Sequence, residues 1–222
     1  MRAMRFWLSV LPFISILVLL SCSSQPANVS TSKPAESEKK LEPALSTALP
    51  CLERMAGQAM RWEMDALPYS MESEANEEAI GQDGRSTVWH ARFASASASQ
   101  SKTFNCSGSR LKDSPPLGIT GERDVPYRPG LTIMTFSRER VAVDSDEAAS
   151  LATKHGAEEY IKKDPRQPMV FQLGIDPKSN KLIWLAVVGK SQENSKVVII
   201  VDATRPKFLG QFKRNTEKAE GK

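Results

Sequence analysis

The two halves of the chain match each other in sequence, and this internal repeat is the strongest constraint on the fold. Residues 89–93 (WHARF) align with residues 184–188 (WLAVV), and residues 101–106 (SKTFNC) align with residues 195–200 (SKVVII). In each half these segments follow a helical pattern. The repeat therefore predicts one helix and three strands per half, with the two aligned tryptophans in equivalent core positions.

The first half, residues 44–110, begins with an amphipathic pattern. Apolar side chains recur every three to four residues from Ala44 to Met60, which indicates a helix with one buried face. Pro50 lies on the polar side and predicts either a kink or a delayed helix start. Strand patterns then follow at residues 67–73, 86–94 and 102–107.

The second half, residues 144–213, carries a clearer helix signal. Asp144 as N-cap and Glu147 at the third helical position can bond each other's free amides, and Asp164-Pro165 ends the pattern. Strand patterns follow at residues 169–175, 182–188 and 196–201. We therefore expect an α+β fold of two repeated helix-plus-antiparallel-sheet units, with separate sheets or one shared sheet.

The N-terminus has the form of a bacterial export signal. Arg2 and Arg5 precede an apolar run from Phe6 to Leu20, which is too short to span a bilayer. The run ends in Leu19-Leu20-Ser21-Cys22, which resembles the lipobox of bacterial lipoproteins. An ordinary cleaved signal followed by an accidental cysteine is the alternative.

The lipobox resemblance implies removal of residues 1–21 and acylation of Cys22, including a palmitate-type chain. Several acyl chains anchor a protein to a membrane far more firmly than a single chain does. Ser23 stands where an aspartate would signal inner-membrane retention, so in a Gram-negative cell we expect attachment to the outer membrane, facing the periplasm. Residues 22–43 are then the acylated N-terminus with a flexible tether, and residues 214–222 a disordered tail.

The second half resembles the PepSY family, a small α+β module of exported bacterial proteins. The resemblance covers residues 144–210 and rests on one helix, three antiparallel strands and the ending Val201-Asp202-Ala203-Thr204. Residues 44–110 join it through the internal match only, and Arg205-Pro206 departs from the glycine that usually follows the threonine. The resemblance implies tandem PepSY-like modules that bind, or inhibit, proteases and other exported proteins.

Cys51 and Cys106 are the two thiols that remain after Cys22 is acylated. Exported compartments are commonly oxidising, so an even pair predicts a disulfide. The repeat places Cys51 near Leu151 on the helix and Cys106 at Ile200 on the last strand, where helix and sheet should meet. Two buried, unbonded thiols remain the alternative.

Residues 111–143 form a proline-rich connector between the two halves. Its four prolines exclude a helix, and a connector of this length is often functional. We therefore name Tyr127, Leu131, Ile133 and Phe136 as a possible partner surface. Packing between the two units, or formation of an edge strand, is the structural alternative.

The residue types give little support for catalysis. His90 and His155 lie in a strand pattern and a helix pattern, without an identifiable nucleophile or zinc-type ligand set. The formal net charge of +4 is mild, so no nucleic-acid role is expected. We expect a membrane-anchored, non-catalytic, cofactor-free module that binds or regulates an envelope protein. An envelope hydrolase or a small-ligand carrier, with a site between the two halves, is the alternative.

Overall fold

The first helix, α1 (Ala48–Trp62), forms where the apolar side chains recur at helical spacing. The computed structural model describes residues 42–128 and 134–213, and this helix starts at Ala48 rather than at Ala44. Pro50 lies in its first turn, where a backbone N–H has no partner inside the helix. Of the two possibilities for Pro50, the delayed start is therefore the correct one.

The helical segment of the second half is broken in the middle. It consists of α2 (Ser145–Ala152), an irregular turn η2 (Thr153–Ala157) and α3 (Glu158–Lys163). Gly156 has φ 126°, a conformation that L side chains rarely adopt, and it interrupts the regular helix. Among the residues with assigned placement, no helix is long and apolar enough to cross a membrane.

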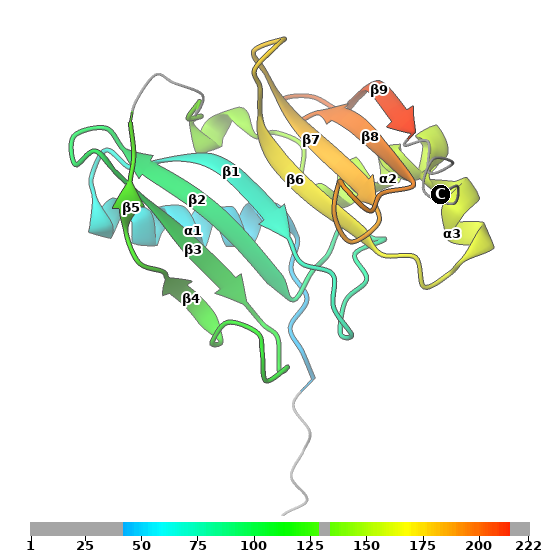
Figure 1. The fold of residues 1–222 in the computed structure, drawn as a ribbon, viewed down its shortest axis with the longest axis horizontal. Helices are drawn as coiled ribbons and strands as arrows, with labels where there is room; N and C mark the ends of the chain where they lie inside the picture. The colour runs from blue at the N-terminus through cyan, green and yellow to red at the C-terminus, as the bar shows by residue number, and fades with distance from the viewer. Residues whose placement is uncertain (1–41, 129–133, 214–222) are drawn as a thin grey trace, which may run out of the picture. The chain divides into compact units, whose positions relative to one another are not determined.

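The strands form one continuous antiparallel sheet rather than two separate sheets. They are β1 (Leu67–Ser73), β2 (Val88–Ser95), β3 (Gln100–Ser107), β4 (Gly118–Gly121), β5 (Val125–Pro126), β6 (Met169–Asp176), β7 (Lys181–Val188), β8 (Val197–Asp202) and β9 (Lys207–Lys213). Their order is β4-β3-β2-β1-β6-β7-β8-β9, and β5 also pairs with β3 (Figure 1). The two halves join where Ser70, Met71 and Glu72 of β1 pair with β6.

The helices all cover the same face of this sheet, behind the strands in Figure 1. Helix α1 contacts β1, β2 and β3, and α2 contacts β7 and β8. A short turn, η1 (Arg138–Arg140), precedes α2. The main core therefore lies in one layer between the helices and the sheet, and the opposite face has no helix among the described elements.

Two tryptophans meet at the centre of this core. Trp89 of β2 and Trp184 of β7 are fully buried, and their rings make an edge contact with centroids 6.5 Å apart. Each indole N–H donates at 2.9 Å to a backbone carbonyl just before a helix: Trp89 to Ser46, and Trp184 to Val143. Each tryptophan therefore fixes the chain entering the helix of its own half.

The N-termini of α1 and α2 share capping groups. The Asp144 carboxylate accepts from the backbone N–H of Ser145 at 2.7 Å and from that of Leu49 in α1 at 2.9 Å. The Ser145 hydroxyl accepts from the N–H of Ala48 at 2.9 Å. The prediction of Asp144 as N-cap is confirmed, but its second partner is α1 rather than Glu147, so one carboxylate caps both helices.

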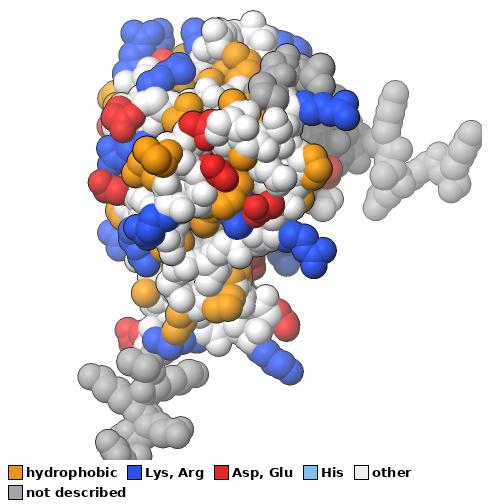
Figure 2. Space-filling view, turned by 90° about the vertical axis from the view of Figure 1, so that its left-hand side faces the viewer, with side chains coloured by type: hydrophobic (Ala, Val, Ile, Leu, Met, Phe, Trp, Pro, Cys, Tyr) orange, Lys and Arg blue, Asp and Glu red, His pale blue; other side chains and the backbone are white. Residues whose placement is uncertain are grey.

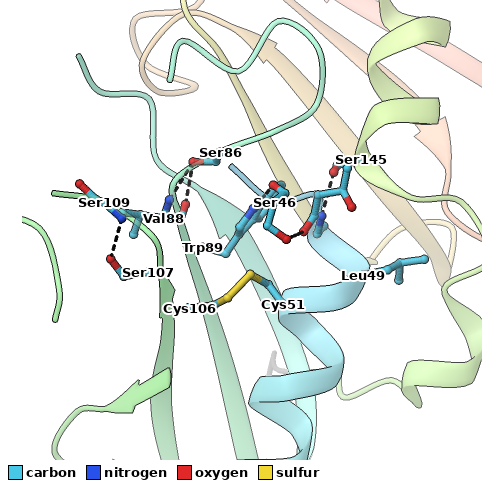
Figure 3. Close-up of a disulfide and its surroundings, with 12 residues drawn as sticks. Ser46, Leu49, Cys51, Ser86, Val88, Trp89, Cys106, Ser107, Ser109 and Ser145 are labelled. Atoms are coloured by element: carbon cyan, nitrogen blue, oxygen red, sulfur yellow. Dashed lines mark hydrogen bonds between the residues drawn. A yellow bond between two sulfur atoms is a disulfide. The ribbon is translucent and has the colours of Figure 1, made fainter. Parts of the chain in front are cut away.

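The structure contains the predicted disulfide between Cys51 and Cys106, shown in Figure 3. Its Cα atoms are 5.7 Å apart, and it links α1 to β3 inside the core. The predicted alignment of Cys106 was wrong by one residue. Cys106 lies opposite Trp89, and the residue opposite Trp184 is Val201, whereas Ile200 points to the other face of the sheet.

Candidate functional site

The helix-free face of the sheet differs in chemistry between the two halves. Side chains alternate along each strand, so those next to the core residues Trp89, Ala91 and Trp184 point away from the helices. In the first half these side chains are polar: Glu72, His90, Arg92, Thr103 and Asn105. In the second half they are mostly apolar: Val170, Ile183, Leu185, Val187, Val198, Ile200 and Phe212.

Strands β7 and β8 are apolar on both faces, although helices cover only one. An antiparallel strand with a free face normally alternates apolar and polar residues, and a continuous apolar run is typical of strands buried on both sides. Val170, Val187 and Val198 are buried in a small second cluster. Ile183 and Ile200 are only half-buried, and Phe212 is 47% exposed. The chain itself therefore buries the part of this face formed by Val170, Val187 and Val198, and the part around Ile183, Ile200 and Phe212 stays accessible.

The same face contains a hollow of about 880 Å³ where the two halves join. That volume is within the range of small-ligand sites. Its walls come from β1 and β2 of the first half and from β6 to β9 of the second.

Two strand glycines open the floor of this face. Gly174 of β6 lies in register with Ile183, and Gly210 of β9 with Ile200. A Cβ on Gly174 would meet only the Tyr69 carbonyl, at an ordinary 3.5 Å, and a Cβ on Gly210 would meet nothing within 4 Å. Neither glycine has a positive φ. Neither φ nor packing therefore requires them. Gly210 lies beside the register shift between β8 and β9, and a glycine inside a strand marks either such a bulge or the close approach of a ligand.

The charges around the hollow leave positive side chains available. Glu72 pairs with Arg92 at 3.1 Å. A hydrogen bond from the Ser179 hydroxyl, followed by backbone amides and nearby Lys178, holds the pKa of Asp176 below its usual value. Lys181 extends the β7 row of Ile183 and lines the hollow. It makes no ion pair within the parts of the chain that the structure describes.

The two histidines have structural partners. His90 lies on the polar half of the face, with Nδ1 2.7 Å from Asn105 Oδ1 and Nε2 3.3 Å from Glu74 Oε2. The His155 ring stacks on Phe208, with centroids 4.1 Å apart. Across residues 42–128 and 134–213, no group of three His, Cys, Asp or Glu side chains is placed to hold a metal ion.

Two of the four residues that we named on the connector, Tyr127 and Phe136, are not exposed. Tyr127 and Phe136 are buried, at 7% and 1% exposure, and Phe136 N–H donates to Pro68 of β1. The connector adds β4 and β5 beside β3, which is the edge-strand alternative. Leu131 and Ile133 lie outside the described residues, as do the signal segment 1–21, Cys22, most of the 22–43 tether and the 214–222 tail.

Exposed apolar side chains also occur on other surfaces, among them Met60 and Met64. Figure 2 shows the end of the molecule at the left of Figure 1, where hydrophobic side chains are interspersed with Lys, Arg, Asp and Glu.

Sequence reasoning missed the sheet-face site. The uninterrupted apolar runs at residues 182–188 and 197–201 were its available signal, because an antiparallel strand with one solvated face would alternate.

Comparison with known proteins adds one structural neighbour. No family model matches the chain. No curated protein matches it in sequence. A crystal structure of a protein provisionally described as a lipoprotein, from Clostridium difficile 630, superposes with a TM-score of 0.46 and 10% identity. The match covers 72% of this chain and 90% of the other.

Proposed function

We propose that this protein is a lipid-anchored, non-catalytic binding module of the cell envelope, and that it binds an envelope protein through the helix-free face of its sheet. The observation that carries the proposal is the pair β7 and β8, which are apolar on both faces while helices cover one. An exposed apolar surface beside a polar one is typical of an interaction site. This surface replaces the connector as the proposed partner site.

We further propose that the two halves are tandem PepSY-like units, related by the internal repeat. Support comes from the matched indole hydrogen bonds of Trp89 and Trp184, each to the carbonyl that precedes a helix N-cap. Cys106 opposite Trp89 and Val201 opposite Trp184 extend the match to the third strand of each half.

The anchor is proposed at Cys22, with attachment to the outer membrane if the cell is Gram-negative. Metabolic labelling with an alkyne-tagged fatty acid should mark the wild-type protein and leave Cys22→Ala unmarked, because acylation needs the thiol. Cys51 and Cys106 are joined in a disulfide and offer no second site. Equal labelling of the two forms would contradict the anchor.

The protein-binding surface is tested by photo-crosslinking in cells at two matched exposed positions. A photoreactive amino acid at Phe212, 47% exposed on the sheet face, should trap a discrete protein partner. The same group at Met60, 57% exposed on α1, should not, since that helix lies on the opposite face.

Two further measurements, both with the variant Ile183→Asn, complete the test of this binding surface. The product at Phe212 should disappear when Ile183→Asn is added, and the identified partner, once purified, should bind Ile183→Asn more weakly than wild type. Identical products from Phe212 and Met60, or a product that Ile183→Asn leaves unchanged, would contradict binding through this face.

The hollow supports a second candidate, a small-ligand carrier. Its volume of about 880 Å³ and its walls from both halves are what a carrier with a site between the halves requires.

A further inference from the structure

We infer that the hollow on the helix-free face binds a single-chain anionic amphiphile, such as a long-chain fatty acid. The inference rests on the proposal that this face is the binding surface, and it names the ligand class of the carrier alternative. Three observations carry it: the apolar side chains that β7, β8 and β9 contribute to the hollow, the two glycines, and the position of the lysines.

The chemistry of the apolar strip favours a hydrocarbon chain. Inside a sheet the backbone N–H and C=O groups are occupied by neighbouring strands, so only side chains are available to a ligand lying on the face. On β7, β8 and β9 those side chains are Ile183, Leu185, Ile200, Leu209 and Phe212, which cannot form hydrogen bonds and which we call the apolar strip. Gln172, the cross-strand partner of Leu185, borders the strip and is hydrogen-bonded to Gln192. A ligand over this strip therefore gains free energy by burying apolar surface.

The two glycines widen the space over the strip. Leu185 of β7 is the cross-strand partner of Ile200 in β8, and Ile200 is in turn the partner of Gly210 in β9. Gly174 of β6 is the cross-strand partner of Ile183, two residues before Leu185 on β7. With open space above both glycines, a flexible chain can lie against the backbone there. Glycine thus occupies two positions where a larger side chain would fit, and the free volume above them is available to a ligand.

The charges favour a negative head group at one end of the strip. On β7 the helix-free side reads Lys181, Ile183, Leu185 and Val187, a cation followed by three apolar residues. Lys178 lies in the adjoining turn and also lines the hollow. Of the two carboxylates in the lining, Glu72 is paired with Arg92, and Asp176 accepts a hydrogen bond from Ser179. Lys181 lies opposite Asp176 across the β6–β7 hairpin but makes no ion pair within the described residues, so its ammonium group can meet a carboxylate ligand.

The test measures binding of laurate to the full-length chain in its Cys22→Ala form, which cannot carry an acyl chain of its own. Isothermal titration calorimetry should show saturable binding of laurate below its micelle concentration and weaker binding of dodecanol, which lacks the charge. Gly174→Leu should weaken laurate binding by about 100-fold, because the leucine side chain fills the volume that three or four methylene groups of laurate would occupy.

Matched variants separate ligand loss from unfolding. Gly174→Leu should keep the melting temperature of the parent, since the Cβ position is open, and Gly57→Ala on α1, another open glycine, should leave both affinity and melting temperature in place. Lys181→Glu should weaken laurate but not dodecanol. Absence of saturable laurate binding, or equal affinities for wild type and Gly174→Leu, would overturn the inference.

The result also separates this inference from the proposed function. If laurate does not bind while Phe212 still traps a protein partner in cells, the amphiphile is wrong and the binding surface stands. If the crosslinks at Phe212 and Met60 are identical while laurate binds and Gly174→Leu abolishes binding, the protein partner on this face is wrong and the ligand site stands.

Discussion

Replacing both Cys51 and Cys106 with alanine should lower the free energy of unfolding by about 4 kcal/mol. The disulfide joins residues 55 apart in sequence, so it removes many conformations from the unfolded chain. It also fixes α1 to β3 within the core. Urea denaturation followed by circular dichroism measures the effect, with Cys22→Ala in every form so that no other thiol is present.

The wild-type disulfide should behave like the double variant once it is reduced under denaturing conditions and refolded in reductant. This comparison separates the loss of the cross-link from the loss of two sulfur atoms. A decrease below about 1 kcal/mol for both forms would mean that the cross-link adds little to stability, against the chain-entropy argument.

Asp144→Ala should lower the free energy of unfolding by about 3 kcal/mol, more than the loss of an ordinary helix cap. The side chain accepts hydrogen bonds from the first turns of two helices, at Ser145 and at Leu49. Its negative charge also lies at the positive ends of both helix dipoles. The same denaturation experiment measures the loss.

Asp144→Asn is the matched control, because its amide oxygen can still accept both hydrogen bonds while the charge is removed. We expect it to lose about 1 kcal/mol, from the helix dipoles alone. If Asp144→Ala loses no more free energy of unfolding than Asp144→Asn does, the hydrogen bond to Leu49 contributes little. The helices α1 and α2 are then not coupled through this carboxylate.

Much of the local structure could be predicted because it depends on residues close together in sequence. The period of apolar residues located α1, and the apolar runs located β6, β7 and β8. Asp144 was identified as an N-cap because capping involves its immediate neighbours. The break at Gly156 was missed, since one glycine in a helical pattern is compatible with either a continuous or an interrupted helix.

Long-range relations were harder to predict. The disulfide was predicted correctly, although the alignment used to predict it was shifted by one residue. The shift arose because the length of a loop between two strands does not fix their register. Such a shift moves a side chain to the opposite face, which is why Ile200 lies on the helix-free side while Val201 lies opposite Trp184. The connector residues Tyr127 and Phe136 were named as a possible partner surface, with packing or an edge strand as the alternative, and both side chains are buried.

By itself the sequence determined the helix and strand types, because propensity and periodicity are properties of short segments. It also predicted the cysteine pair, because only two thiols remain once Cys22 is acylated. Only the tertiary structure decided that β1 pairs with β6 into one sheet and that Asp144 caps two helices. It also decided that no helix among the described elements covers one apolar face of the sheet. These outcomes depend on contacts between residues far apart in the chain, whose relative free energies no local pattern encodes. The candidate site arises at that level, where Gly174, Lys181 and Phe212 come together on one face.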